Sequence, residues 1–345
     1  TAGCSPKEGR ILRLSTLSRL TPLRLVRHVV NQVVANTEGV AVHPQSFFDR
    51  ASCAVLFLDY SCLSAVSGEL FKRHGLEDVQ VLASTLNTYL GRIVDRLTQC
   101  GGDVIKFAGD AVLVVFMVTD EADLAHQTLK ASQLSLECIA ELQAGRSVEG
   151  VTLTAHSGIG VGEITGFMVG GVFNRSEYTV VGEPVYQAAS ANPVAEESQT
   201  VISAEGWALI ESRAEGQQTE DGHWIVKAVK AADSLSDTSL ASGGDMADEL
   251  ARLSRSDMNR TANEIKRVVP GAVRNRLPEF TPTSIPCISE FRFVTILYAR
   301  VVGLDYSRGD EELKKVQTIV KLIQETIYVH DGNFMRFSMD DRGAV

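Results

Sequence analysis

The chain turns back on itself in the stretch GGDVIKFAGDAVL, which covers residues 101–113. Its glycine pair marks a turn, and Ala108-Gly109 forms the tip of a tight hairpin between two short strands. Upstream, the run AVLFL at residues 54–58 is apolar and β-prone, as a buried strand should be. Asp59 follows this run, and Asp110 lies in the hairpin. If the strands are neighbours in one sheet, both carboxylates leave the same end of it.

Two carboxylates at one end of a sheet can share a divalent cation. Mg²⁺ favours sparse oxygen sites, in which one or two carboxylates bind it and water or substrate phosphates fill the other positions. Solvated turn residues and helix caps are a commoner explanation of such acids. The pair alone therefore does not establish a metal site, and the surrounding sequence has to distinguish the two interpretations.

Strands and helices alternate between residues 47 and 231. Leucines and other apolar residues recur at helical spacing over residues 79–98, and residues 121–142 predict a second helix. Residues 151–162 are strand-like and are expected to enter a glycine-rich turn, and residues 223–228 predict a closing strand. The order strand, helix, hairpin, helix, strand predicts an α+β fold on the ferredoxin-like βαββαβ plan.

Three motifs in this region resemble those of the class III nucleotidyl cyclases. Residues 58–64 (LDYSCLS) resemble the first metal motif of that family, and residues 101–111 resemble the second. Residues 177–185 (EYTVVGEPV) resemble the strand and turn that complete its site. Within the family, the sequence of these motifs is most similar to that of the soluble, bicarbonate-responsive adenylyl cyclases. Those enzymes carry two unequal cyclase domains in one chain.

The resemblance implies a catalytic site and a reaction. Asp59 and Asp110 would hold two Mg²⁺ ions, which Mn²⁺ can replace, and the main-chain carbonyl of Tyr60 would be a further ligand. The reaction implied is that of an adenylate cyclase, a phosphorus-oxygen lyase that converts ATP into 3′,5′-cyclic AMP and pyrophosphate for intracellular signalling. The substrate phosphates would be bound by consecutive main-chain N–H groups at a helix start, those of Ser61, Cys62, Leu63 and Ser64.

The resemblance also implies an internal repeat. Residues 291–300 can be aligned with the strand that ends in Asp59. Residues 332–340 can be aligned with residues 102–110 without a gap. Ala299 then stands in the place of Asp59, so the second copy lacks one metal carboxylate. Arg336 stands in the place of Lys106 and is the implied base-binding residue. We therefore expect the two cyclase domains to pair within the molecule, with one working site at their interface.

These observations divide the chain into four parts. Residues 1–46 are a helical lead-in, with an amphipathic helix over residues 20–34, and residues 47–231 are the first cyclase domain. Residues 232–288 are a linker, expected to be mobile up to residue 258 because Ser, Asp and Gly predominate there. Residues 289–345 are expected to be the start of a second cyclase domain that is truncated at its end. By itself, the chain is expected to show little or no activity.

The first copy departs from the family at two positions that stabilise the transition state. Tyr186 and Ser190 stand where family members carry an asparagine and an arginine. A catalytically silent regulatory or nucleotide-binding module therefore remains an alternative. A polymerase-palm or GGDEF-type enzyme is a third, although the Lys-Phe-Ala-Gly-Asp turn and the Val-Val-Gly strand favour a cyclase.

A regulatory pocket is a further implication of the resemblance. Lys106 and Val180 would belong to a possible bicarbonate pocket, but the arginine that such a pocket needs aligns with Ala189. Lys106 could instead pair with a nearby acid such as Asp103. His156 is expected to face the core or a hydrogen-bond partner, because metal-ligand companions at suitable spacing are not found.

Composition limits the class of protein. The 345 residues are 44% hydrophobic, without an apolar run of the roughly 18 residues that a membrane span needs. The net charge of −10 argues against nucleic acid as a partner. The six scattered cysteines indicate reduced thiols, so a cytoplasmic location is expected. A basic, acid-poor start leaves organelle targeting as the alternative.

Overall fold

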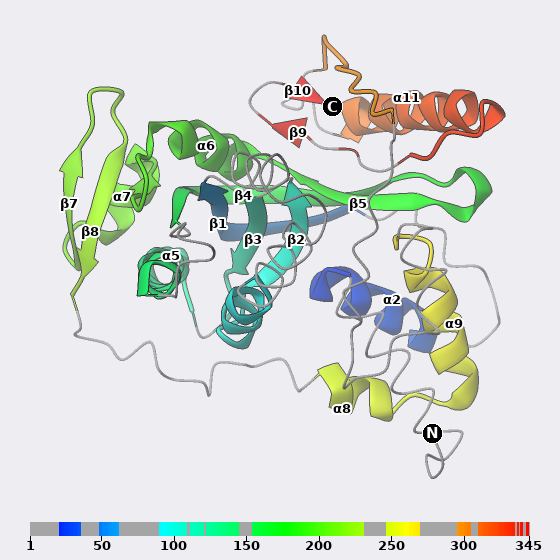
Figure 1. The fold of residues 1–345 in the computed structure, drawn as a ribbon. Coiled ribbons are helices and arrows are strands. Elements are labelled where there is room, and N and C mark those ends of the chain that lie inside the picture. Colours follow the sequence, from blue (N-terminus) through cyan, green and yellow to red (C-terminus); the bar gives the residue numbers. More distant parts are fainter. Residues whose placement is uncertain are drawn as a thin grey trace, which may run out of the picture.

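The computed structural model describes residues 21–35, 48–61, 90–108, 111–120, 122–144, 154–230, 246–269, 295–304, 310–334, 337, 339–340 and 343–344. Within these residues, one large sheet is flanked by helices, and a long helix lies at one end (Figure 1). The sheet carries most of the residues that the sequence motifs single out.

Four antiparallel strands form the centre of this sheet. β1 (Phe48–Ser61) pairs with β3 (Ala111–Met117) on one side and β4 (Thr154–Gly170) on the other, and β2 (Asp103–Ala108) pairs with β3. A helix that covers residues 90–99 precedes β2, and α5 (Leu124–Ala144) joins β3 to β4. The strand order β2-β3-β1-β4 is that of the ferredoxin-like plan. The prediction of an α+β fold is confirmed.

The sheet continues beyond β4. β6 (Thr200–Ile202) runs parallel to β4, followed by β8 (Trp224–Val229) and β7 (Ala214–Gln218). β8 confirms the closing strand predicted at residues 223–228. β5 (Ser176–Val181) pairs with the far half of β4, so the two strands form a long ribbon that extends past the central strands (Figure 1).

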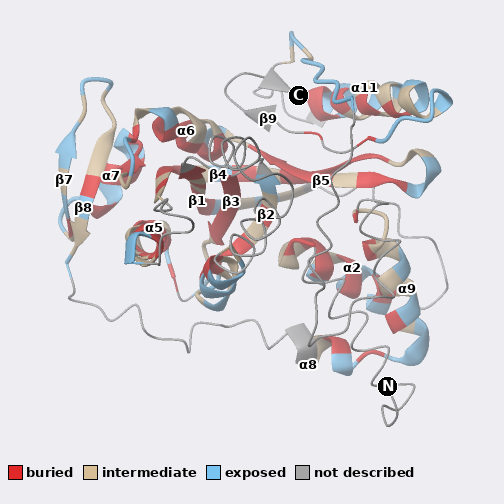
Figure 2. Cartoon of the chain, viewed as in Figure 1, coloured by how far each residue is buried: buried red, intermediate tan, exposed pale blue. Residues whose placement is uncertain are grey.

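Both faces of the central strands are buried. Alternate residues of β1, such as Leu56 and Leu58, pack against α5 and the helix over residues 90–99. The intervening Cys53 and Val55 face a second apolar cluster that includes α2 (Leu23–Ala35) and α6 (Glu183–Ala191). Because helices cover both faces, the sequence of β1 over residues 54–58 is a continuous apolar run and does not alternate between apolar and polar residues. Figure 2 shows these strands as the buried centre of the molecule.

β4 remains a strand through its glycines between residues 158 and 166, so the predicted glycine-rich turn is wrong. The glycines serve close packing instead. A Cβ atom at Gly158 would lie 2.0 Å from the carbonyl oxygen of Ala188, and one at Gly160 would lie 2.1 Å from that of Pro184. Only glycine therefore allows α6 to rest directly on this strand.

The lead-in and the expected linker meet on one face of the sheet. The helix predicted over residues 20–34 is confirmed as α2. The prediction of a mobile linker is wrong for residues 246–258, because these form α8 (Met246–Ala251) and the start of α9 (Arg255–Ile265). Met258 and Ile265 are buried in the same cluster as the apolar face of α2. Burial of that shared face supplies the stability that the composition of this segment does not suggest.

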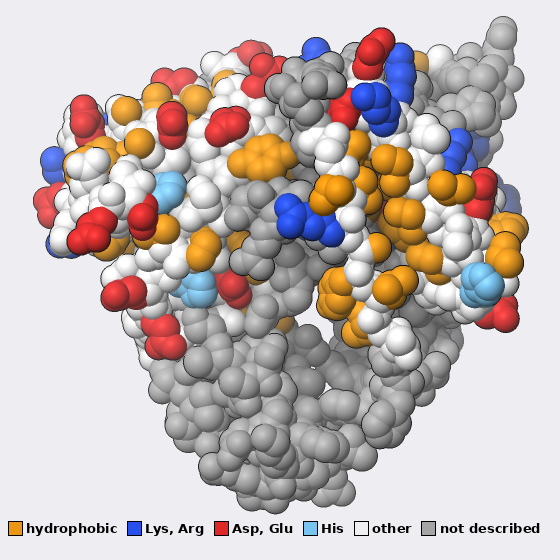
Figure 3. Space-filling view, turned by 90° about the horizontal axis from the view of Figure 1, so that it is seen from above, with side chains coloured by type: hydrophobic (Ala, Val, Ile, Leu, Met, Phe, Trp, Pro, Cys, Tyr) orange, Lys and Arg blue, Asp and Glu red, His pale blue; other side chains and the backbone are white. Residues whose placement is uncertain are grey.

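The described residues after position 289 do not show a second copy of the cyclase fold. They form α11 (Asp310–Val329) and a short ladder between β9 (Met339–Asp340) and β10 (Gly343–Ala344). Residues 295–300 were expected in a strand but form no regular element, and Leu297 and Tyr298 are 80% and 79% exposed. Figure 3 looks down on this side of the molecule, where hydrophobic side chains are exposed.

α11 lies along the end of the β4–β5 ribbon (Figure 1). Val316 and Val320 of the helix are buried against Phe167, Val169 and Val181 of the ribbon. Within the described part of the chain, no helix combines the length and the apolarity that crossing a membrane would require.

Candidate functional site

Asp59 lies in β1, two residues before the strand ends at Ser61. The expected strand end at Asp59 is therefore wrong, because β4 continues to pair with β1 as far as Ser61. Asp59 stands opposite Ala111 on β3 and opposite His156 on β4. Its side chain is 28% exposed, so the carboxylate is accessible although the strand around it is buried.

His156 is a cross-strand neighbour of Asp59. Its Nε2 atom lies 3.9 Å from Oδ2 of Asp59, and its side chain is 19% exposed. The sequence predicts that His156 faces the core or a hydrogen-bond partner. That prediction does not include its position beside Asp59, the candidate metal ligand. No motif marked this histidine, because its proximity depends on the pairing of two strands that are distant in sequence.

Asp110 lies outside the described residues, as does Gly109. The flanking strands are described, and Ala111, which follows Asp110 in the chain, is the cross-strand partner of Asp59. The joint binding of one cation by Asp59 and Asp110 stays a prediction. Among the described residues, no group of three or more His, Cys, Asp or Glu side chains converges on one point.

Tyr60 points away from Asp59, to the other face of the sheet. Its side chain is 5% exposed, and its hydroxyl has no hydrogen-bond partner among the described residues. Burial raises the pKa of this phenol well above its ordinary value. The side chain therefore serves the core, and only the main chain of Tyr60 is left for the predicted metal contact. Ser61 ends β1, whereas Cys62, Leu63 and Ser64 lie outside the described residues.

Lys106 lies on β2 opposite Leu113, next to a bulge between Val104 and Lys106. It is half-buried, and it shares a face of the sheet with Asp59, because Leu113 in turn pairs with Phe57. Val180 is completely buried in the apolar cluster on that face, so its side chain contributes packing. The regulatory pocket at these two residues stays a prediction.

The carboxylate of Asp103 caps the start of α2. It accepts hydrogen bonds from the main-chain N–H groups of Leu23 and Arg24, at 2.8 and 3.0 Å. The suggested pairing of Lys106 with Asp103 gains no support from these contacts. Burial raises the pKa of the Asp103 carboxyl, while both hydrogen bonds act to lower it.

α6 presents the two positions at which the chain departs from the cyclase motifs. Tyr186 is half-buried. Ser190 donates its hydroxyl proton to the carbonyl of Gln187 in the same helix, at 3.0 Å. The buried Gln187 holds α6 on the sheet, because its side-chain oxygen accepts hydrogen bonds from Val161 N–H and the Ser203 hydroxyl.

The residues assigned to the second copy are not brought to the site in the described structure. Ala299 lies in the irregular, exposed segment 295–300, and Arg336 lies outside the described residues. The buried Phe334 and Phe337 pack with α11. A role for Arg336 in base binding stays a prediction.

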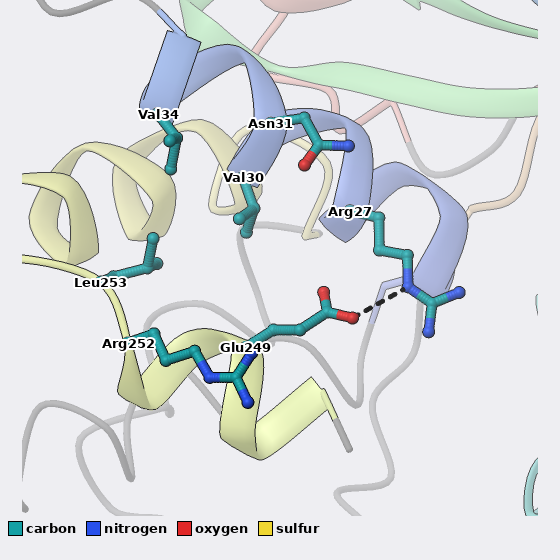
Figure 4. A pocket seen from close by; sticks show the side chains of 7 residues that line it. All are labelled: Arg27, Val30, Asn31, Val34, Glu249, Arg252 and Leu253. Carbon is teal, nitrogen blue, oxygen red and sulfur yellow. Dashed lines mark ion pairs between the residues drawn. The ribbon is translucent and has the colours of Figure 1, made fainter. Parts of the chain in front are cut away.

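A separate open pocket of about 400 Å³ lies between α2 and the α8–α9 segment (Figure 4). Val30, Val34 and Leu253 form its apolar wall, and Arg27 and Glu249 pair across it at 3.5 Å. This pocket contains none of the predicted site residues. The candidate site is therefore defined by Asp59 and its neighbours on the sheet.

Comparison with curated proteins finds similarity to adenylate cyclases. No family model matches the chain. Adenylate cyclase type 10 of Mus musculus is 29% identical over 159 residues, which cover 45% of this chain and 10% of that protein. The Homo sapiens protein of that name is 27% identical over 191 residues, 54% of this chain and 11% of that protein. The chain thus spans about a tenth of the length of these relatives.

An uncharacterized protein of Mycobacterium tuberculosis (strain ATCC 25618 / H37Rv) is 30% identical over 198 residues, 57% of this chain and 33% of that protein. Among solved structures, the catalytic core of a rhodopsin-guanylyl cyclase with converted specificity, in complex with ATPalphaS, has a TM-score of 0.45 and 19% identity. It covers 53% of this chain and 99% of that chain. The adenylyl cyclase CyaB from P. aeruginosa has a TM-score of 0.43 and 22% identity, and covers 54% and 98%.

Proposed function

Because this chain contains a class III nucleotidyl cyclase domain, distantly homologous to adenylate cyclase type 10 over about half its length, we propose that it belongs to an adenylate cyclase. In the proposed reaction, the ribose 3′-hydroxyl of ATP attacks the α-phosphorus, and pyrophosphate leaves with formation of 3′,5′-cyclic AMP. The names of the curated relatives favour ATP over GTP as the substrate.

The proposal depends above all on the register between β1 and β3. This register sets Asp59 opposite Ala111, and Asp110 precedes Ala111 in the chain. Consecutive Cα atoms are about 3.8 Å apart and antiparallel partners about 4.5–5.5 Å. The proposal supposes that Asp110, one residue before Ala111 in the sequence, lies close enough to Asp59 for the two aspartates to bind one cation between them.

The chemistry of the donors fits magnesium. Asp59 offers an accessible carboxylate, and the second aspartate and the main-chain carbonyl of Tyr60 would complete an all-oxygen set. When bound, two Mg²⁺ ions would lower the pKa of the 3′-hydroxyl and offset the charge on the leaving pyrophosphate. Asp59 and Asp110 would hold the ions, and the N–H groups of residues 61–64 would bind the phosphates.

The chain's own contribution would be alignment. β1 pairs with a strand on each side at Asp59, so the backbone of this residue is held from both directions. Apolar packing on both faces of β1 adds to this rigidity. A carboxylate on a rigid strand needs little reorganisation when the substrate binds. This preorganisation favours the reaction.

The contact made by Ser190 favours the second candidate function. A transition-state arginine would have to extend from α6, but the Ser190 hydroxyl is bonded to its own helix. A catalytically silent module that binds a nucleotide would need no such residue. If the protein is an active cyclase, the missing groups have to come from another domain, as the proposed intramolecular pairing supposes.

Cyclic nucleotide formation by the full-length protein would test the proposal. Product is measured from ATP and from GTP with Mg²⁺ or Mn²⁺, for the wild type and for Asp59→Asn and Asp110→Asn. We expect cyclic AMP from the wild type, and a loss of about 10²-fold or more in kcat for each variant. Asp221→Asn, in an exposed turn, is the matched control and should retain activity.

The two candidate functions give different results. A protein that binds ATP but forms no product would support the silent module. Full activity of Asp59→Asn, with an unchanged melting temperature, would refute the metal site.

A further inference from the structure

The cross-strand pair Asp59 and His156 goes beyond the roles that the motifs assign. We infer that His156 is a positioning residue for Asp59, which holds one carboxylate oxygen so that the other faces the cation. This inference rests on the proposed metal-dependent function. It concerns a residue on β4, a strand to which the metal motifs assign no ligand.

The strand register makes the contact a fixed feature of the fold. His156 is paired with Asp59 along a ladder that runs the full length of β1. Because directly opposite residues in antiparallel strands extend to the same side of the sheet, the two side chains have to be neighbours. The Nε2 to Oδ2 distance of 3.9 Å agrees with this placement.

Among the cross-strand partners of Asp59 in the described residues, His156 is the polar one. On β3, the opposite position is Ala111, whose methyl group cannot donate a hydrogen bond. Farther along β4, the residues on the same face are Gly158 and Gly160, which carry α6 directly on their backbone. Along this row of β4, the imidazole is therefore a side chain placed to steer the carboxylate.

Carboxylates that bind metals are commonly held by an outer hydrogen-bond partner, whose loss costs about 10–100-fold in metal affinity. A neutral imidazole has one N–H donor available for this purpose. The distance of 3.9 Å is longer than a formed hydrogen bond, but catalytic hydrogen bonds often shorten once the ligand is bound. The imidazole would then fix the rotamer of Asp59 without binding the ion itself.

Mn²⁺ binding, followed by electron paramagnetic resonance on the full-length protein, tests this role without requiring turnover. His156→Gln retains an N–H donor with sufficient reach, whereas His156→Asn carries the same amide on a shorter side chain. We expect about 10-fold weaker Mn²⁺ binding for His156→Asn and near-normal binding for His156→Gln. His330→Leu, at an exposed turn directly after α11, is the control and should bind as the wild type does.

Mg²⁺ competition against Mn²⁺ separates positioning from direct ligation. Positioning weakens the binding of both ions by a similar factor, and the KM for the metal should rise in His156→Asn while the KM for ATP stays unchanged. Equal Mn²⁺ affinity of His156→Asn and the wild type would overturn the inference. Loss of Mn²⁺ affinity with unchanged Mg²⁺ affinity would also overturn it, because that pattern indicates a nitrogen ligand.

Asp59→Ala distinguishes a failure of this inference from a failure of the proposed function. If Asp59→Ala loses Mn²⁺ but His156→Asn does not, the metal site stands and the role of His156 is refuted. If Asp59→Ala binds Mn²⁺ as the wild type does, both the metal site and the role of His156 are refuted. Thermal melting of every variant checks that the fold is retained.

Discussion

Asp103 on β2 caps α2 from far along the chain: its Oδ1 accepts the main-chain N–H of Leu23, 80 residues earlier, at 2.8 Å. Its Oδ2 accepts the N–H of Arg24 at 3.0 Å. The first N–H groups of a helix have no partner within the helix, and a carboxylate there also interacts favourably with the helix dipole. The glycine-rich hairpin motif thus fastens the lead-in helix to the sheet that carries Asp59.

Removal of this cap should destabilise the protein. Asp103 is 7% exposed, so Asp103→Ala would leave two N–H groups with little access to water. We expect a loss of about 1–3 kcal/mol in the free energy of unfolding, measured by urea titration. Asp103→Asn, which keeps one acceptor oxygen, should lose less.

A local cap provides the comparison for Asp103. Asp123 accepts the N–H of His126 at the exposed start of α5, and Asp123→Ala should cost only about 0.5–1 kcal/mol. If Asp103→Ala were no more destabilising than Asp123→Ala, the cap on α2 would not have the importance that we assign to it.

Alanine at Gly158 or Gly160 should displace α6 from the sheet. The added Cβ would lie within 2.0–2.1 Å of carbonyl oxygens of that helix, which is well inside van der Waals contact. Overpacking of this kind costs about 1–3 kcal/mol or more, and the melting temperature should fall accordingly. Gly91→Ala is the matched control, because a Cβ there meets nothing within 4 Å and Gly91 is helical. That substitution should stabilise the protein by up to about 1 kcal/mol.

Two glutamine side chains should hold α11 on the β4–β5 ribbon. Gln317 both accepts the N–H and donates to the carbonyl of Gly170, each at 2.8 Å. Gln324 accepts from Val172 N–H at 3.2 Å and donates to the Arg175 carbonyl at 3.0 Å. In Gln317→Ala and Gln324→Ala, we expect faster amide hydrogen exchange in residues 310–329, because the helix opens more readily.

Thr318→Ala serves as the control for α11. The Thr318 hydroxyl donates only to the Lys314 carbonyl of the same helix among the described contacts, so exchange should stay near the wild-type rate. Unchanged exchange in both glutamine variants would show that apolar packing alone retains the helix.

The buried cysteines should resist alkylation in the folded protein. Burial raises the pKa of the Cys53 and Cys138 thiols to about 12. The reactive thiolate forms only as the pH approaches that value, so both should remain unmodified by iodoacetamide at pH 8. Among these three described cysteines, half-buried Cys100 should be labelled before the other two, and peptide mass spectrometry can follow each site separately. Labelling of Cys53 as rapidly as Cys100 in the folded protein would contradict the burial.

Local sequence patterns predicted several elements well, because the residues within a short stretch decide whether it forms a strand or a turn. The apolar run before Asp59 and the glycine pair before Asp103 specify a strand and a turn, and Gly101 has the positive φ of 84° that such a turn favours. The same reasoning failed where one residue type has two uses. The glycines of β4 predict a turn by this reasoning, whereas in the structure they permit the close approach of α6.

From the sequence alone follow the type and order of the central elements and the chemistry offered by Asp59 and Asp110, because side-chain periodicity and turn residues act over short stretches of chain. Only the tertiary structure places His156 beside Asp59, Asp103 at the start of α2, and α8 and α9 against α2. Those contacts join segments far apart in the chain. They depend on strand register and on the joint burial of apolar faces, which no short stretch of sequence specifies.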